Sequence, residues 1–139
     1  MALELNSLIK AIDSLKRAIN TVDEHQDQFS GDLRDVAHAG VIQNFEVAYE
    51  QCWKFTQRWI RENRTTEEAD YPRSRKELFR VAARYGLISD PLPWFEFGGA
   101  RNLTSHTYDA AQAGAAYEIA RRFLSHAEEL LKRLEERND

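Results

Sequence analysis

The stretch VIQNFEVAYEQCWKFTQRWI, residues 41–60, decides the fold. Its large apolar side chains recur mostly at steps of three and four residues, a spacing that places them on one face of an α-helix. We predict a long helix that begins at Leu33 or Val36 and ends at Asn63. Aromatic side chains bury large areas, so we expect this helix, including Phe55, to form the centre of the core. The other residues expected on its buried side are Val41, Ile42, Phe45, Ala48, Tyr49, Cys52, Trp53, Thr56, Trp59 and Ile60.

Four other segments also have helical patterns, over residues 3–23, 74–85, 94–104 and 110–136. Gly86 suits the left-handed residue that ends a helix, and residues 88–93 are expected to form a turn because they contain two prolines. The Gly98-Gly99 pair weakens the helix over 94–104. The first of these helices has an apolar stripe of Leu5, Leu8, Ile9, Ile12, Leu15, Ile19 and Val22.

These patterns predict an all-α fold. No segment alternates between apolar and polar residues for long enough to be a strand, and short loops between long amphipathic helices favour antiparallel neighbours. The expected architecture is an up-and-down antiparallel bundle of four to five helices. A length of 139 residues, with 42% apolar and 30% charged residues, is typical of one globular unit, so we expect residues 1–139 to form a single domain.

The charge and the N-terminal sequence narrow the functional class. A net charge of −4 argues against a protein that coats duplex nucleic acid with its whole surface. The N-terminal MALELNSLIKAIDSLK mixes charged with apolar residues, so we expect neither a signal peptide nor a membrane span. The single cysteine, Cys52, cannot form an internal disulfide. We therefore expect a cytoplasmic protein that does not bind membranes.

The sequence contains no metal or phosphate-loop motif, and we expect no metal and no cofactor. It has no HExxH, CxxC or acidic calcium loop, no nucleophile elbow and no glycine-rich phosphate loop. Asp35 and His38 could share a helix face, but one such pair is common by chance. The four histidines are well separated along the chain, at His25, His38, His106 and His126.

The densest polar stretch is RNLTSHTYD, residues 101–109, ahead of the last helix. Arg101 could hold a phosphate through bidentate hydrogen bonds, and the imidazole of His106 could take or give a proton near neutral pH. RNA supplies its own nucleophile, the 2′-hydroxyl, so such a site could cleave RNA without a metal. A plainer interpretation is that the stretch supplies exposed surface residues and helix caps.

Helix geometry constrains this candidate site. If the stretch is helical, Arg101 and His106 lie about 140° apart around the axis, so they would not converge within one chain. Asn102 and His106, four residues apart, would share a face. One solution is that two copies of the chain meet, so that each phosphate contacts residues from both.

A second candidate is a basic stripe on the helix over 74–85. In an acidic protein it could bind an anionic partner, such as an RNA backbone, a nucleotide or an acidic protein surface; the alternative is a solvated outer face. Nearby, Trp94, Phe95 and Phe97 could flank the polar stretch or an interface. The stripe, with residues at three- and four-residue steps, consists of Arg73, Lys76, Arg80 and Arg84.

With these residues in view, the chain resembles the HEPN superfamily. Arg101-x4-His106-x-Tyr108 is similar to its RX4HXY motif, and Asn102 matches the polar residue that follows the arginine. The chain is most similar to the nucleotidyltransferase substrate-binding-like proteins, a branch close to HepT. Residues 41–54, 74–82 and 101–109 carry the resemblance in the family's order, whereas Gly98-Gly99 departs from it.

The resemblance implies a HEPN helical bundle, a homodimer, and a partner that is a minimal nucleotidyltransferase. The pair would be a toxin and its antitoxin. It also implies that Arg101 and His106 belong to a metal-independent endoribonuclease, with Asn102 orienting His106 or contacting phosphate. Tyr108 would receive AMP from the partner, which would silence the nuclease. The alternative hypothesis is a non-catalytic subunit that binds substrate or nucleotide for the transferase.

Overall fold

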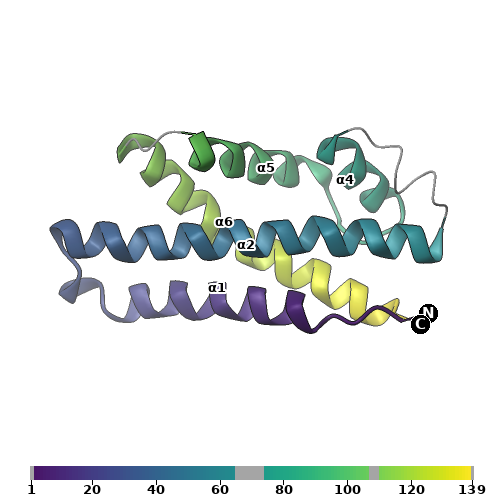
Figure 1. The fold of residues 1–139 in the computed structure, drawn as a ribbon, viewed down its shortest axis with the longest axis horizontal. Helices are drawn as coiled ribbons and strands as arrows, with labels where there is room; N and C mark the ends of the chain where they lie inside the picture. The colour runs from purple at the N-terminus through teal and green to yellow at the C-terminus, as the bar shows by residue number, and fades with distance from the viewer. Residues whose placement is uncertain (1, 65–73, 107–109, 139) are drawn as a thin grey trace.

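We describe a computed structural model over residues 2–64, 74–106 and 110–138, with side chains outside residues 103–112. Within these ranges the chain forms five α-helices, one short 3-10 turn over Gln26–Gln28 and no strand, so the all-α prediction is confirmed. The helices alternate in direction along the bundle, apart from the short α4 (Figure 1). They are α1 (Asn6–Glu24), α2 (Gly31–Asn63), α4 (Arg75–Arg84), α5 (Pro91–His106) and α6 (Ala110–Glu136).

The long helix α2 runs through the middle of the molecule. Figure 1 shows α1 along one side of it and α4 with α5 along the other, while α6 crosses it obliquely. All the other described helices pack on α2, as the aromatic face of α2 predicts.

The two ends of the chain lie together, because the side-chain amide of Asn138 donates to the Leu3 carbonyl at 2.9 Å and its oxygen accepts from the Leu3 N–H at 2.6 Å.

The ends of α4 follow local rules that the sequence makes visible. The Ser74 hydroxyl accepts a hydrogen bond from the Glu77 N–H at 3.3 Å and so caps the first turn. Gly86 has a φ of 78°, as predicted, and the Leu87 N–H reaches back to the Ala82 carbonyl at 2.9 Å. This pattern satisfies the last carbonyls of the helix. The chain then continues directly to α5.

The start of α5 differs from the prediction. The helix begins at Pro91, not at Trp94, and so includes residues that we expected to form a turn. A proline costs nothing in the first turn of a helix, where the backbone N–H has no partner within the helix. The Asp90 carboxylate accepts from the Leu92 N–H at 3.0 Å and helps to begin the helix. The helix also continues through Gly98 and Gly99.

The core is aromatic at its centre. The Phe123 ring of α6 lies 5.1 Å from Phe45 and from Phe97, 5.6 Å from Trp94 and 6.3 Å from Tyr49, measured between centroids. Trp94 and Phe97 are each 1% exposed, so they are core residues and the suggestion that they lie at an interface is wrong. They pack inward because the longer α5 turns that face towards α6.

Two other expectations about burial need correction. Ile9 is 38% exposed, and Ala11 is buried on the same helix instead. Trp53 is only half-buried, because its indole N–H donates to the Glu50 carboxylate at the edge of the bundle, at 2.8 Å. Within the described ranges, no helix combines the length and the apolar character needed to cross a lipid bilayer.

Phe123→Ala should lower the free energy of unfolding by about 3–5 kcal/mol, because it leaves a cavity among four aromatic rings. Urea unfolding at pH 7 measures this. Leu92→Ala, at a side chain that is 65% exposed, is the control and should stay within about 0.5 kcal/mol of the wild type. A loss below about 1 kcal/mol for Phe123→Ala would mean that the core does not depend on this ring.

Candidate functional site

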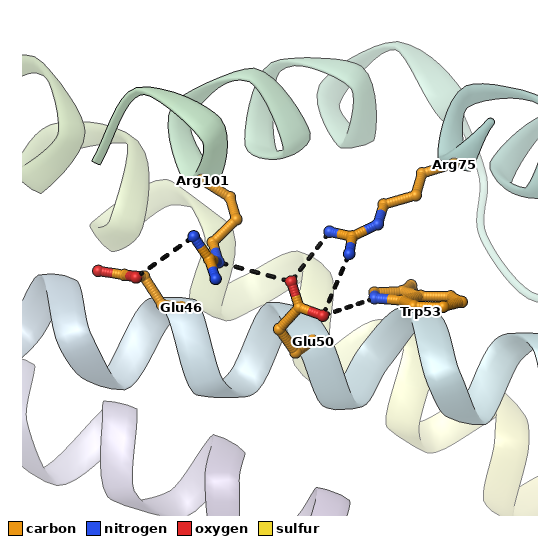
Figure 2. A network of polar contacts seen from close by, with 5 residues as sticks. All are labelled: Glu46, Glu50, Trp53, Arg75 and Arg101. Atoms are coloured by element: carbon orange, nitrogen blue, oxygen red, sulfur yellow. Dashed lines mark hydrogen bonds and ion pairs between the residues drawn. The ribbon is translucent and has the colours of Figure 1, made fainter. Parts of the chain in front are cut away.

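Two arginines from α4 and α5 meet two glutamates of α2. Figure 2 shows Arg75 and Arg101 converging on Glu50. The Arg75 guanidinium donates Nη1 to Glu50 Oε1 at 3.0 Å and Nη2 to Oε2 at 3.2 Å, a bidentate pair. Arg101 Nε lies 3.4 Å from the same Oε1, and its Nη1 lies 3.5 Å from Glu46 Oε2. This charge cluster ties α4 and α5 to α2.

Local helix geometry explains the cluster. Glu46 and Glu50 are four residues apart on α2, so their carboxylates point to the same side. Trp53, one turn further along, holds Glu50 Oε2 through its indole N–H and presents its ring to Arg75, whose Cζ lies 4.7 Å from the centroid. Trp53 and Arg75 therefore hold the Glu50 carboxylate in the position where Arg101 pairs with it.

The environment of Glu50 favours its charged form. Partial burial opposes ionisation, but the Trp53 hydrogen bond and the Arg75 and Arg101 guanidiniums outweigh it, so the pKa of Glu50 is lowered from its ordinary value of 4.5. The side chain is 24% exposed, so water screens these contacts less than on the open surface. Glu50 is thus an anion that holds two cations at neutral pH.

Arg101 is oriented by ion pairs but is not fully buried. Its side chain is 25% exposed, and its ion pairs at 3.4 and 3.5 Å are longer than the 2.7–2.9 Å of strong charge-assisted bonds. Two carboxylates and two guanidiniums also give the charge cluster no net charge. The arrangement orients the Arg101 guanidinium towards α2.

Arg101 and Asn102 point in different directions. Arg101 turns towards α2, whereas Asn102 is exposed and lines an open pocket between α4 and α5, together with Lys76. The structure therefore brings Asn102 near a residue of the basic stripe. Neither residue's role is tested by this geometry, and both stay predictions.

His106 is the last residue of α5. Because the helix includes Arg101 as well, the two residues lie about 140° apart around its axis. The side chain of His106, and all of Tyr108 and Arg73, lie outside the described residues. The predicted pairing of Arg101 with His106 therefore stays a hypothesis.

The described part of the basic stripe lies on the exposed face of α4. Lys76, Arg80 and Arg84 are all exposed, and the first two cover the Phe95 ring, with Lys76 Nζ 5.7 Å and Arg80 Cζ 5.1 Å from its centroid. Arg75, on the same helix, turns instead to Glu50. Sequence reasoning missed the charge cluster, although two glutamates one turn apart in the aromatic block 41–54 could have drawn attention to it.

Of the Asp35–His38 pair, His38 packs against α6. The His38 ring stacks on Tyr117 with centroids 3.8 Å apart, and burial, helped by Arg34, lowers the pKa of His38. Among the residues that the structure describes, no three His, Cys, Asp or Glu side chains are grouped to hold a metal ion.

Glu50→Gln should lower the free energy of unfolding at pH 7 by about 1 kcal/mol, because charged hydrogen bonds contribute roughly 1.5–3 kcal/mol when buried and less when partly exposed. Since the folded-state pKa is lowered, the contribution is complete above the ordinary value of 4.5 and is lost as the pH falls through the lowered pKa. Urea unfolding at pH 7 and at about pH 3 compares the two conditions.

Glu46→Gln is the matched control for this experiment. Its ion pair with Arg101 is 3.5 Å long, so its removal should change stability by about 0.5 kcal/mol or less. If both variants lose the same amount of stability at pH 7, Glu50 is not the group that joins the three helices.

The sequence matches a known family over nearly its whole length. Residues 3–136 match the model for nucleotidyltransferase substrate binding protein like. The chain is 33% identical over 138 residues to a Haemophilus influenzae protein named "Probable ribonuclease HepT", a match that covers 98% of this chain and 94% of that protein.

Solved structures agree with this match. A Haemophilus influenzae protein, described as having the fold of a substrate binding domain of a nucleotidyltransferase, superposes with a TM-score of 0.87 at 32% identity, over 95% of this chain and 99% of its own. A Thermus thermophilus protein superposes with a TM-score of 0.72 at 28% identity, over 91% of this chain and 98% of its own. The resemblance found in the sequence is therefore confirmed, and the chain belongs to the family of nucleotidyltransferase substrate binding proteins.

Proposed function

We propose that this protein is a HEPN-type, metal-independent endoribonuclease that acts as the toxin of a toxin–antitoxin pair in the cytoplasm. The observation that carries the proposal is the motif Arg101-x4-His106 at the end of α5, with the Arg101 guanidinium oriented by carboxylates of α2. The family and the name of the Haemophilus influenzae relative support it.

The proposed chemistry needs only these side chains and RNA. His106 takes the proton of a 2′-hydroxyl, whose oxygen attacks the adjacent phosphorus. Arg101 stabilises the additional negative charge that develops on the phosphate oxygens. The bond from phosphorus to the 5′-oxygen then breaks, water protonates that oxygen, and the products are a 2′,3′-cyclic phosphate and a 5′-hydroxyl. Asn102 would orient His106 or contact the phosphate.

We further propose that the active form is a homodimer. Arg101 and His106 both lie on α5, about 140° apart, so one phosphate cannot easily contact both in the same chain. A second copy related by a two-fold axis would bring its own His106 towards Arg101. The site is therefore incomplete in one chain and complete in two.

The partner that we propose is a minimal nucleotidyltransferase. It would transfer AMP from ATP to Tyr108: the phenol oxygen attacks the α-phosphorus, the proton leaves to a base, and pyrophosphate departs. The phosphate would then lie two residues from His106 and compete with RNA for Arg101. This step would silence the nuclease.

One observation favours a second function, a non-catalytic subunit that binds substrate or nucleotide for the transferase. The charge cluster around Arg101 has no net charge, and the whole chain carries −4. Such a surface has little general affinity for RNA. The same residues would then hold a nucleotide without breaking a bond.

RNA cleavage by the purified protein in EDTA tests the first proposal. His106→Ala should slow cleavage about 10²–10⁴-fold, the usual contribution of a general base. Arg101→Lys should slow it about 10²-fold or more, because lysine keeps the charge but loses the planar pair of donors. Gel analysis of a labelled RNA measures both rates.

Matched variants separate chemistry from folding. His126→Ala, at a ring that packs on Phe97, and Arg122→Lys, at an exposed residue of α6, should cleave as the wild type does. A mixture of Arg101→Lys and His106→Ala chains should regain activity if the site combines two copies. Wild-type protein that cleaves no RNA, or His106→Ala protein that cleaves normally, would overturn the nuclease.

Co-expression with the partner nucleotidyltransferase tests the regulation. The intact mass of this chain should increase in steps of AMP, and the modified protein should lose RNA cleavage. Tyr108→Phe should show no increase, because it lacks the acceptor oxygen. Tyr85→Phe, at a half-buried tyrosine after α4, is the control and should gain mass normally. Mass gained by Tyr108→Phe would assign the acceptor elsewhere.

A further inference from the structure

An open pocket of about 580 Å³ lies between α4 and α5, beside the charge cluster. Pockets of this size are suited to small organic ligands. The pocket is next to Arg101 in two ways: Asn102 is one of its lining residues, and Arg75 shares Glu50 with Arg101. Its lining is Tyr49, Ser74, Arg75, Lys76, Phe79, Trp94, Phe95, Gly98, Gly99 and Asn102.

The charges of this lining favour an anion. Among the described residues it includes two cations, Arg75 and Lys76, and no Asp or Glu. Glu50 does not line the pocket but pairs with Arg75 from the α2 side, so the excess positive charge of the lining comes from Lys76. Lys76 is exposed, so its ammonium can approach a ligand without breaking a buried contact. Ser74 adds a hydroxyl at the start of α4.

A buried tyrosine supplies a second, independent observation. Tyr49 has 0% exposure, and its hydroxyl has no hydrogen-bond partner among the described residues. Buried polar groups in folded proteins nearly always have one. The Arg75 Cζ lies 5.5 Å from the Tyr49 ring centroid, so the two residues are neighbours in the lining of the pocket. Burial raises the pKa of Tyr49, although the Arg75 guanidinium beside it acts in the opposite direction.

Gly98 leaves room for this hydroxyl. A Cβ at Gly98 would lie 2.8 Å from the Tyr49 hydroxyl oxygen, closer than real contacts allow, whereas a Cβ at Gly99 would meet no described atom within 4 Å. The helix continues through both residues. The glycine that departs from the family's pattern therefore opens the space where α5 passes the Tyr49 hydroxyl.

The apolar walls indicate what else the ligand contains. Phe79 and Trp94 stack with centroids 4.8 Å apart, and Phe95 is half-buried beside them. Aromatic walls next to cations are typical of sites that bind single nucleotides of RNA, because every base has a face that can stack. Inorganic phosphate would make no stacking contact with these aromatic side chains.

We propose that the pocket between α4 and α5 binds one nucleoside monophosphate unit, with its phosphate at Arg75, Lys76 and the Tyr49 hydroxyl and its base against Phe95. The inference deepens the proposed function, on which it rests, by giving an RNA or nucleotide substrate a binding subsite beside Arg101. The unit can come from an RNA chain or from a free nucleotide, and the chemistry of recognition is the same.

Isothermal titration with AMP, adenosine and inorganic phosphate tests the pocket. AMP should bind saturably and at least fivefold more tightly than either fragment. Tyr49→Phe should weaken AMP binding about tenfold without lowering the melting temperature, because the deleted hydroxyl has no hydrogen-bond partner in the described protein. Lys76→Met, at an exposed side chain, should weaken it as well.

Tyr117→Phe is the matched control. The Tyr117 hydroxyl accepts from Arg121 Nη1 at 3.2 Å, and Tyr117 is not among the residues that line this pocket, so the variant should bind AMP as the wild type does. A short RNA that binds tighter than AMP, with the same loss in Tyr49→Phe, would identify RNA as the source, and a weaker one would identify free nucleotide.

The two proposals can fail separately. Equal affinity of Tyr49→Phe and wild type for AMP, no binding of AMP at millimolar concentration, or equal affinity for AMP and phosphate would overturn the pocket, even if RNA is cleaved. Saturable AMP binding that depends on Tyr49, in a protein that cleaves no RNA, would support the pocket and overturn the nuclease.

Discussion

The geometry of the candidate site depends on one carboxylate. Glu50 of α2 accepts from Arg75 of α4, from Trp53 of its own helix, and pairs with Arg101 of α5. These contacts join three helices that are distant in sequence, at a place where only a quarter of the glutamate side chain is exposed. Because α5 carries the proposed catalytic motif, the position of Glu50 determines where the Arg101 guanidinium can meet a phosphate.

The same constraint limits how the protein could recognise RNA. Arginines neutralised by carboxylates cannot attract a long phosphate backbone from a distance, and the chain as a whole is acidic. Affinity must then come from short-range contacts: the exposed cations Lys76, Arg80 and Arg84, and the pocket between α4 and α5 that we propose for one nucleotide unit. Recognition of a few nucleotides, and not of extended RNA, is what this distribution of charge favours.

The features that depend on neighbouring residues along the chain could be predicted from the sequence. The period of residues 41–60 predicted α2 and its buried face, and the end of α4 at Gly86 followed from backbone chemistry. The sequence also singled out Arg101 and Asn102. It could not show that Arg101 and Arg75 both pair with Glu50, because these contacts depend on how α4 and α5 pack on α2.

The residues at positions 49 and 98 are not the pair that would stabilise the core best. For the core alone, phenylalanine at 49 would bury the same ring without an unpaired hydroxyl, and alanine at 98 would suit the helix better than glycine. Tyrosine at 49 requires glycine at 98, because a Cβ there would lie 2.8 Å from the hydroxyl oxygen, and the two residues meet at the pocket between α4 and α5. Local choices that oppose stability are expected at functional sites. That coincidence is the physical reason to look for a ligand there.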